Sequence, residues 1–336
     1  MRIALDAMGG DHAPREIIRG AARGMKFLGP DDTLVLYGPK ETVEAECGAI
    51  GFSDSRIRFE HCTQVIGMDD SPVDGLRQKR DSSIVRMAND GAKDLVDALI
   101  SAGNTGAFAG ACQLKIGAMD GVSRPGIAIL MPTFHGPVII CDVGANVAPK
   151  PRHLYEYARL SAVYAKVVLK IDDPKIGIVS IGEEAGKGNT LVKEAFALMR
   201  DDPALTFIGN VEGRDIFAGA GNVFICDGFT GNVTLKLTEG LAEGLFKTIR
   251  HELLQESGPE LAKQFEPVVE RIWKRHDFAE HGGAPLLGLR KVAIICHGRS
   301  DQRAIANAIR VAVEQVRLGI IDLMAQDLAG VREGAE

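Results

Sequence analysis

Short apolar runs alternate along the chain with stretches whose apolar residues recur every three to four positions. The short runs predict β-strands at residues 2–5, 33–37, 98–101, 126–131, 138–141, 176–181, 206–208, 223–226 and 292–296. The periodic stretches predict helices whose apolar stripes start at Ile17, Leu191, Leu237 and Ile305. Such alternation is typical of an α/β protein with a mainly parallel sheet sandwiched by helices.

Two of the predicted strands follow each other too closely for a helical crossover. Only residues 132–137 separate the runs 126–131 and 138–141, so we expect an antiparallel hairpin inserted into the parallel pattern. Because the chain has no low-complexity tract or Pro/Ser linker, we predict one domain over residues 1–336, either undivided or with two lobes. Residues after about Asp322 are expected to form a fraying tail.

Composition narrows the class of protein. Hydrophobic residues make up 46% and charged residues 25% of the chain, which is ordinary for a globular protein, and the net charge of −6 argues against a general nucleic-acid binder. The 6 cysteines are scattered without zinc spacing, so we expect buried free thiols and no metal site. Asp6 and Asp11 interrupt the amino-terminal apolar run, and no run of about 18 apolar residues follows. We therefore expect a cytoplasmic protein.

Polar, glycine-rich segments follow six of the predicted strands. Ligands in open α/β sheets bind beyond the carboxyl ends of strands, so we expect these loops to meet at one end of the sheet. Backbone N–H groups and helix N-termini would make that crevice suitable for an anion. The loops span residues 6–12, 101–106, 142–146, 182–189, 209–213 and 227–232.

Standard catalytic motifs do not identify the reaction. The loop around Lys187 has three residues between Gly182 and Gly186 and so departs from a Walker A loop, and the chain has neither G-x-G-x-x-G after a strand nor G-x-S-x-G. Lys187, flanked by glycines, either is solvated or reaches a bound anion. Asn232 either caps the next helix or binds a ligand, and His12 is either an acid/base group or a solvated or capping histidine.

The ordered set of loops resembles the phosphate acyltransferases that begin bacterial phospholipid synthesis. The resemblance covers nearly the whole chain, with departures at His281 and Gly75, where the family often has tyrosine and alanine. Its motifs are Asp6-Ala7-Met8-Gly9-Gly10-Asp11, Pro72, Arg77, Lys79, Ser82-Ser83, Ser101-Ala102-Gly103-Asn104-Thr105-Gly106-Ala107, Asp142-Val143-Gly144-Ala145-Asn146, Gly186-Lys187-Gly188-Asn189, Ile208-Gly209-Asn210-Val211-Glu212, Asp227-Gly228-Phe229-Thr230-Gly231-Asn232-Val233, residues 282–288 and His297-Gly298.

Membership would imply transfer of a long-chain acyl group from acyl carrier protein to inorganic phosphate, with no cofactor. It would also imply a homodimer, a fold shared with phosphotransacetylases and β-decarboxylating dehydrogenases, and a membrane glycerol-3-phosphate acyltransferase that consumes the acyl phosphate. The resemblance points to Lys187 and Asn232 as catalytic, with His12 as a further candidate. The expected substrate- and phosphate-binding residues are Asp6, Gly9, Gly10, Asp11, Ser101, Gly103, Asn104, Thr105, Gly106, Asp142, Asn146, Gly188, Asn189, Asn210, Glu212, Asp227, Gly228, Thr230 and Gly231.

The segment 258–288 is expected to be amphipathic and helical, with Leu261, Phe265, Val268, Val269, Ile272 and Trp273 on one face. That face is either core or dimer surface, or it lies reversibly on an anionic membrane. Two basic clusters are candidates for docking the acidic carrier: Arg77, Lys79 and Arg80, and Arg271, Lys274 and Arg275. Competing hypotheses are an acetyl- or butyryl-type phosphotransferase that uses coenzyme A, a metal-dependent dehydrogenase, and a non-catalytic scaffold.

Overall fold

The computed structural model describes residues 1–256, 258–276, 280 and 282–333. Within these residues a sheet of 11 strands has the order β3-β2-β1-β4-β11-β10-β5-β6-β9-β7-β8. The strands are β1 (Arg2–Asp6), β2 (Thr33–Gly38), β3 (Ile57–His61), β4 (Ala98–Ser101), β5 (Gly126–Met131), β6 (Val138–Cys141), β7 (Lys175–Val179), β8 (Thr206–Val211), β9 (Val223–Ile225), β10 (Ala284–Leu287) and β11 (Val292–Ile295).

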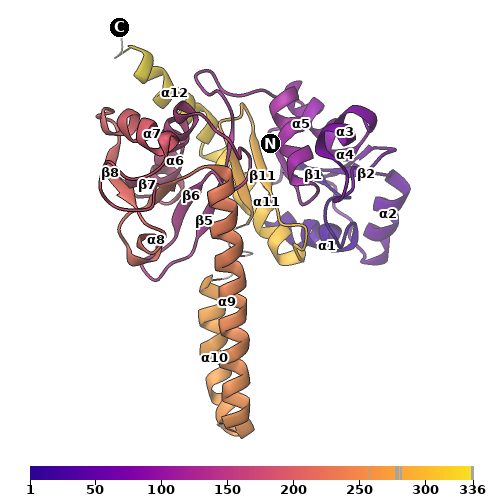
Figure 1. Ribbon diagram of the computed structural model, residues 1–336. Coiled ribbons are helices and arrows are strands. Elements are labelled where there is room, and N and C mark those ends of the chain that lie inside the picture. Colours follow the sequence, from indigo (N-terminus) through magenta and orange to yellow (C-terminus); the bar gives the residue numbers. More distant parts are fainter. Residues whose placement is uncertain (257, 277–279, 281, 334–336) are drawn as a thin grey trace.

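Helices cover the sheet, and two of them project from it (Figure 1). The helices are α1 (Arg15–Gly24), the short 3-10 turn η1 (Met25–Phe27), α2 (Lys40–Ala49), α3 (Pro72–Gln78), α4 (Ser83–Ala92), α5 (Thr105–Lys115), α6 (Pro151–Val168), α7 (Thr190–Arg200), α8 (Asp215–Ala218), α9 (Gly228–Glu256), α10 (Gly258–His276), α11 (Gln302–Arg317) and α12 (Ile320–Glu333). The expected α/β architecture, a mainly parallel sheet between helices, is confirmed.

Every strand predicted from an apolar run is present, although some ends differ by a few residues. The run 176–181 forms a strand only to Val179, whereas β8 continues beyond the predicted 206–208 to Val211. Two strands were missed. In β3 apolar and polar residues alternate in the sequence Ile-Arg-Phe-Glu-His, and β10 contains Pro285, so neither has the continuous apolar run that marks a buried strand.

Three antiparallel junctions divide the strands into two groups of opposite direction. Strands β3, β2, β1, β4 and β11 are parallel, as are β6, β9, β7 and β8. Between the groups, β10 is antiparallel to β11 and β5, and β5 is antiparallel to β6. The pairing of Met131 with Val138 confirms the expected hairpin. Because three reversals leave a net reversal, the strands of the two groups run in opposite directions.

Both faces of the sheet are buried, as α/β packing requires. Ile3 and Leu5 in β1 belong to one apolar cluster, whereas Ala4 between them belongs to a second cluster. Helix α11 packs on α1, and α6 packs on α7 and α12. The 6 cysteines are free and buried, as expected for reduced thiols in a core.

Helices α9 and α10 form a hairpin that extends well beyond the body (Figure 1). The predicted apolar stripe on α9 is largely exposed in the single chain: Leu237, Leu241 and Leu245 are 69%, 68% and 56% accessible. The amphipathic helix expected over 258–288 ends at His276, and Ala284–Leu287 forms β10 in the middle of the sheet instead. The side chains of Leu261 and Trp273 lie outside the described residues.

The carboxyl-terminal segment is not the tail that the sequence suggested. Residues 320–333 form α12, whose Met324 and Leu328 are buried. The buried Arg159 guanidinium on α6 lies 2.7 Å from Asp327 and 2.9 Å from Asp202. Packing and this ion-pair network therefore hold α12 against the body, which local hydrophobicity does not predict.

Candidate functional site

The six loops that were expected to meet at one end of the sheet follow strands of two opposite directions. Loops 6–12 and 101–106 follow β1 and β4, which belong to the first group of parallel strands. Loops 142–146, 182–189 and 227–232 follow β6, β7 and β9, which run in the opposite direction. Residues 209–211 of the predicted loop 209–213 lie within β8 of the same group, and the chain leaves that strand at Glu212. The apolar runs predict strands but not their direction, so this division could not be derived from them. The candidate site therefore has two halves.

Asp6 shapes the first loop from within the protein. Its carboxylate accepts hydrogen bonds from Ser101 Oγ at 2.7 Å and from the Met8 N–H at 3.1 Å. Burial raises the pKa of Asp6 despite these hydrogen bonds. A Cβ at Gly9 would lie 2.6 Å from Asp6 Oδ2, so the loop requires glycine there. Asp6 and Ser101, both expected to contact substrate, are buried and position the loop.

The next three residues carry the loop to the surface. Gly10 has φ +104°, a conformation that favours glycine, and the Asp11 N–H donates to the Gly298 carbonyl at 2.8 Å. This hydrogen bond joins the loop after β1 to the loop after β11. Asp11 and His12 are exposed to solvent where the two loops meet.

The loop after β4 ends in a helix cap. Asn104 Oδ1 accepts a hydrogen bond from the Ala107 N–H at 3.0 Å, and its Nδ2 donates to the carbonyls of residues 67, 68 and 70. Gly103 donates its N–H to Ser101 Oγ at 3.0 Å. Thr105 and Gly106 follow as exposed residues of the first turn of α5. Asn104 therefore presents this helix N-terminus.

A buried carboxylate also organises the loop after β6. Asp142 accepts hydrogen bonds from the N–H groups of Gly144, Ala145 and Asn146 at 3.0, 2.9 and 2.7 Å. Burial raises the pKa of Asp142 even though these N–H groups favour the charged form. Asn146 Nδ2 donates to Tyr157 Oη at 2.7 Å. Both Asp142 and Asn146 are buried, so they support the exposed backbone at Gly144.

The loop after β9 leads into α9, whose first turn packs against the loop after β6. Asp227, not Asn232, is the cap, because its carboxylate accepts from the N–H groups of Phe229 and Thr230 at 3.0 and 2.9 Å. Thr230 Oγ1 also donates to Asp227 at 2.7 Å. A Cβ at Gly228 would lie 2.8 Å from the Asn146 carbonyl oxygen. Glycine at this position therefore lets the helix approach the neighbouring loop closely.

Asn232 lies inside α9, so the alternative that it caps the helix is wrong. It is exposed and faces the loop after β6, because a Cβ at Gly144 would be 4.0 Å from Asn232 Cβ and Oδ1. An exposed amide beside an exposed glycine backbone can donate a hydrogen bond to a ligand oxygen.

Lys187 is exposed on the loop between β7 and α7. The loop is held by Asn210, whose Nδ2 donates to the Glu184 carbonyl at 2.7 Å, and by Asn189, which caps α7 by accepting from the Val192 N–H at 2.9 Å. Gly188 has φ +96° and makes the turn. Among the residues that the structure describes, none forms an ion pair with the Lys187 ammonium. Its charge is therefore available to an anion.

Strand pairing brings the Lys187 loop and Asn232 to the same edge of the sheet. In the parallel register Ile225 of β9 pairs with Ile178 of β7 on one side and with Cys141 of β6 on the other. The loops that follow these strands are therefore neighbours. Glu212, after β8, lies 3.1 Å from the Arg214 guanidinium, which neutralises it.

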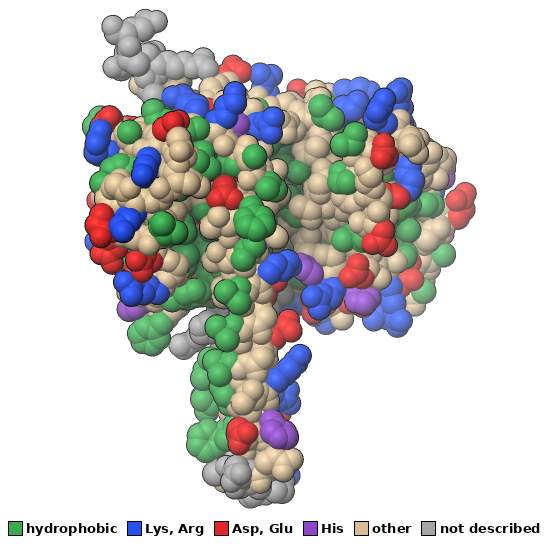
Figure 2. Space-filling model, viewed as in Figure 1, with side chains coloured by type: hydrophobic (Ala, Val, Ile, Leu, Met, Phe, Trp, Pro, Cys, Tyr) green, Lys and Arg blue, Asp and Glu red, His purple; other side chains and the backbone are tan. Residues whose placement is uncertain are grey.

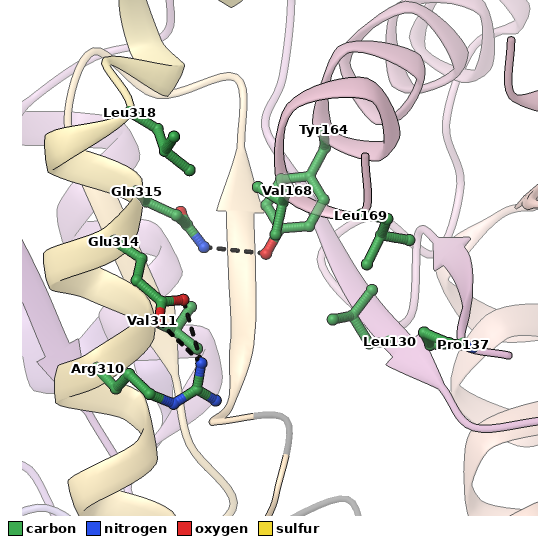
Figure 3. A pocket seen from close by; sticks show the side chains of 10 residues that line it. All are labelled: Leu130, Pro137, Tyr164, Val168, Leu169, Arg310, Val311, Glu314, Gln315 and Leu318. Atoms are coloured by element: carbon green, nitrogen blue, oxygen red, sulfur yellow. Dashed lines mark hydrogen bonds and ion pairs between the residues drawn. The ribbon is translucent and has the colours of Figure 1, made fainter. Parts of the chain in front are cut away.

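A separate apolar hollow lies between α6, α11 and the β5–β6 hairpin (Figure 3). It has a volume of about 200 Å³, and the Gln315 Nε2 donates to Tyr164 Oη at 3.0 Å across it. None of the site residues predicted from the sequence lines this hollow. It is therefore distinct from the candidate site.

The chain is similar in sequence to one family model and to phosphate acyltransferases of other bacteria. Residues 1–323 match the family model described as "Fatty acid synthesis protein". The phosphate acyltransferase of Desulfitobacterium hafniense (strain DSM 10664 / DCB-2) is 44% identical over 333 residues and 98% of both chains, and that of Dictyoglomus turgidum (strain DSM 6724 / Z-1310) is 41% identical over 322 residues and 95% of both.

Solved structures show the same fold at lower sequence identity. A phosphotransacetylase from Streptococcus pyogenes aligns with a TM-score of 0.65 and 21% identity over 94% of both chains. A branched-chain phosphotransacylase from Enterococcus faecalis V583 aligns with a TM-score of 0.57 and 13% identity over 94% of this chain and 99% of that one. At these identities the likeness concerns architecture.

Proposed function

Because the chain belongs to the fatty acid synthesis protein family and is an acyltransferase, we propose that it transfers a long-chain acyl group from acyl carrier protein to inorganic phosphate. The observation that carries the proposal is that the loop of Lys187 and the helix of Asn232 follow neighbouring parallel strands, β7 and β9. A cation and an amide donor beside exposed backbone suit a reaction that joins an anion to a carbonyl.

The proposed reaction needs positioning more than strong acid or base catalysis. A phosphate oxygen attacks the thioester carbonyl carbon, the C–S bond breaks, and the proton of the phosphate monoanion or dianion passes to the departing thiolate. The products are an acyl phosphate and the carrier thiol. Asn232 donates a hydrogen bond to the acyl carbonyl oxygen, Lys187 binds phosphate or the oxyanion, and exposed His12 is a further candidate for proton transfer.

The two buried carboxylates support this chemistry indirectly. Asp6 and Asp142 hold the loops through backbone N–H groups, so these two carboxylates are turned inward and do not face a ligand. This arrangement supports an anionic substrate.

The acidic carrier protein requires a basic docking surface. In the first candidate cluster Arg77 and Arg80 are exposed, while Lys79 is paired with Asp70. In the second cluster Arg271 is exposed, and the side chains of Lys274 and Arg275 lie outside the described residues. The described charges therefore favour Arg77 and Arg80 as the carrier contact.

The projecting hairpin of α9 and α10 supports a homodimer. Exposed Leu237, Leu241 and Leu245 give α9 an apolar face that one chain leaves in contact with water. A second copy of the chain that covers this face removes apolar surface from water, which stabilises the dimer by about 25 cal/mol per Å². We assign this face to the dimer.

Helix α10 supports reversible contact with an anionic membrane. Phe265, Val268 and Ile272 are 45%, 37% and 44% accessible on this helix. No helix in the described part of the chain has the length and apolar composition to cross a bilayer. A surface contact would deliver the hydrophobic acyl phosphate to a membrane glycerol-3-phosphate acyltransferase.

Assay of the purified chain with palmitoyl-acyl carrier protein tests the proposed function. We expect release of free carrier thiol only when inorganic phosphate is present, with equal formation of acyl phosphate. Long- and short-chain acyl-coenzyme A serve as alternative donors in parallel. Faster turnover of acetyl- or butyryl-coenzyme A would favour the coenzyme A phosphotransferase instead, and thiol release without phosphate would contradict both.

A further inference from the structure

One basic side chain on α9 lies close to the proposed acyl site but has no role in the mechanism above. Lys236 follows Asn232 by four residues, so the two share a face of the helix, one turn apart. Both are exposed. A group bound to Asn232 would therefore be within reach of the Lys236 ammonium.

Lys236 joins the two halves of the candidate site. Its Nζ lies 3.0 Å from Nε2 of His297, which follows β11, and 3.2 Å from Glu239 Oε2. His297 is adjacent to Gly298, whose carbonyl accepts the Asp11 N–H of the loop after β1. Lys, Arg and His side chains gather where the hairpin leaves the body (Figure 2). Loops of the two groups of strands thus meet beside α9.

The contact between Lys236 and His297 is a meeting of two hydrogen-bond donors. Nδ1 of His297 accepts the Arg299 N–H at 3.1 Å, so the ring proton is on Nε2. Partial burial and the Lys236 ammonium lower the pKa of His297, which keeps the ring neutral with that single proton. An ammonium cannot accept a hydrogen bond. Glu239 accepts a hydrogen bond from the Lys236 ammonium, but the contact between Lys236 and His297 still joins two donors, and an anionic oxygen bridging both would supply the acceptor.

We propose that Lys236 and His297 bind the inorganic phosphate that attacks the acyl thioester. The inference rests on the proposed function and divides its roles: Lys236 and His297 hold the nucleophile, while Lys187 and Asn232 serve the acyl carbonyl. The proximity to Asn232 selects the attacking phosphate over the phosphodiester of the carrier's prosthetic arm. That phosphodiester is at the far end of the arm from the reacting sulfur.

Titration of inorganic phosphate into the protein, followed by calorimetry or ³¹P NMR, tests the site without turnover. Lys236→Ala is expected to weaken phosphate binding about 10- to 100-fold, the loss of one charge-assisted hydrogen bond. Lys236→Arg is expected to restore part of it. Lys247→Ala is the matched control, since Lys247 lies on the same helix, pairs with Glu243 and is outside the site. Equal phosphate affinity in wild type and Lys236→Ala would overturn the proposal.

Substitutions of His297 test the assigned ring proton. The Gln amide can place an N–H donor where Nε2 lies, whereas the shorter Asn amide reaches only the Nδ1 position. We expect His297→Gln to keep phosphate affinity within a few-fold and His297→Asn to lose about 10-fold or more. The reverse order, or equal loss in both, would contradict the donor role.

Steady-state kinetics separate the phosphate role from other roles. In Lys236→Ala we expect the KM for phosphate to rise about 10- to 100-fold, with the KM for acyl carrier protein nearly unchanged. A rise confined to the KM for the carrier would assign Lys236 to the carrier and overturn the proposal. An equal rise in the KM values for phosphate and for the carrier, together with a loss of thermal stability, would indicate a structural role for Lys236 and would also overturn the proposal. If wild type shows no phosphate-dependent thiol release, the proposed function fails, and the binding titration still decides this site.

Discussion

Gly231, in the first turn of α9, lies against the main chain of Asp142, and a Cβ at position 231 would be 1.9 Å from the Asp142 carbonyl oxygen. This contact seats the helix that carries Asn232 on the loop after β6. Because neither partner is a flexible side chain, a larger residue at position 231 must displace the helix or the loop.

Gly231→Ala is expected to lower stability and activity together. The overlap with backbone costs about 1–3 kcal/mol or more and moves Asn232 away from Gly144. Urea unfolding and the thiol-release assay measure the two effects. Gly240→Ala is the control in the same helix, since nothing lies within 4 Å of its added Cβ; there alanine should stabilise the helix by about 0.5–1 kcal/mol. Equal behaviour of the two variants would contradict the close contact.

Lys187→Ala and Asn232→Ala should each reduce kcat by about 10²–10³, the usual effect of removing one donor to a developing oxyanion. Both side chains are exposed, so we expect the variants to retain wild-type unfolding transitions. Lys193→Ala, an exposed lysine on the neighbouring helix α7, provides the comparison and should keep full activity. Near wild-type turnover in either of the first two variants would remove that residue from the mechanism.

The ion-pair network around Arg159 should make stability depend on acidity. Burial by itself raises the pKa of Asp202, but hydrogen bonds from Tyr155, the Ala204 N–H and Arg159 lower it overall. A carboxyl group whose pKa is lower in the folded protein contributes stability above its unfolded pKa of about 3.9, and the contribution is lost as pH falls through the folded pKa.

Arg159→Met tests this network. At pH 7 the variant should lose about 3–5 kcal/mol of unfolding free energy, because Asp202 remains buried without its partner. The difference from wild type should shrink below about pH 4. Urea unfolding at several pH values measures it. A difference that stays constant from pH 7 to pH 3 would show that Arg159 acts through packing alone.

The apolar face of α9 should determine the oligomeric state. Leu241→Glu introduces a charge in the middle of the exposed stripe, and we expect it to convert a dimer into a monomer in sedimentation velocity runs. Leu114→Glu, on α5, is a control of similar exposure (74%) on another element and should leave the dimer intact. A monomeric wild type over micromolar concentrations would refute the dimer assignment.

Membrane contact should depend on α10. Wild type is expected to float with vesicles that contain anionic lipid and to remain in solution with neutral vesicles. The substitution Phe265→Glu removes an apolar side chain from the membrane interface. The loss of about 1.5–3 kcal/mol of favourable transfer free energy from water to lipid is expected to weaken vesicle binding about 10- to 100-fold. Binding that is absent in wild type, or unchanged in the variant, would exclude this helix as the lipid contact.

Several local features of the site followed from the sequence. Glycine and asparagine after a strand indicated Gly188-Asn189 and Asn104 as loop residues, and the structure shows turns and helix caps there. A preference for capping side chains would also have identified Asp227 in place of Asn232, because aspartate directly precedes the first helical residue. Burial of Asp6 and Asp142 was not predictable in this way, since it depends on the neighbouring strands that bring the Ser101 hydroxyl to Asp6 and the Ile127 N–H to Asp142.

The amino-acid sequence by itself determined most strands, the helices whose apolar stripes start at Ile17, Leu191, Leu237 and Ile305, the hairpin at 126–141 and the family, because these depend on local hydrophobic periodicity and on the order of short motifs. Tertiary structure decided the direction of each strand, the division of the loops between two groups of strands, and the contact of Lys236 with His297, 61 residues away. An apolar run has the same composition in either direction, and long-range pairing depends on which surfaces pack together, so only the folded chain could specify these relationships.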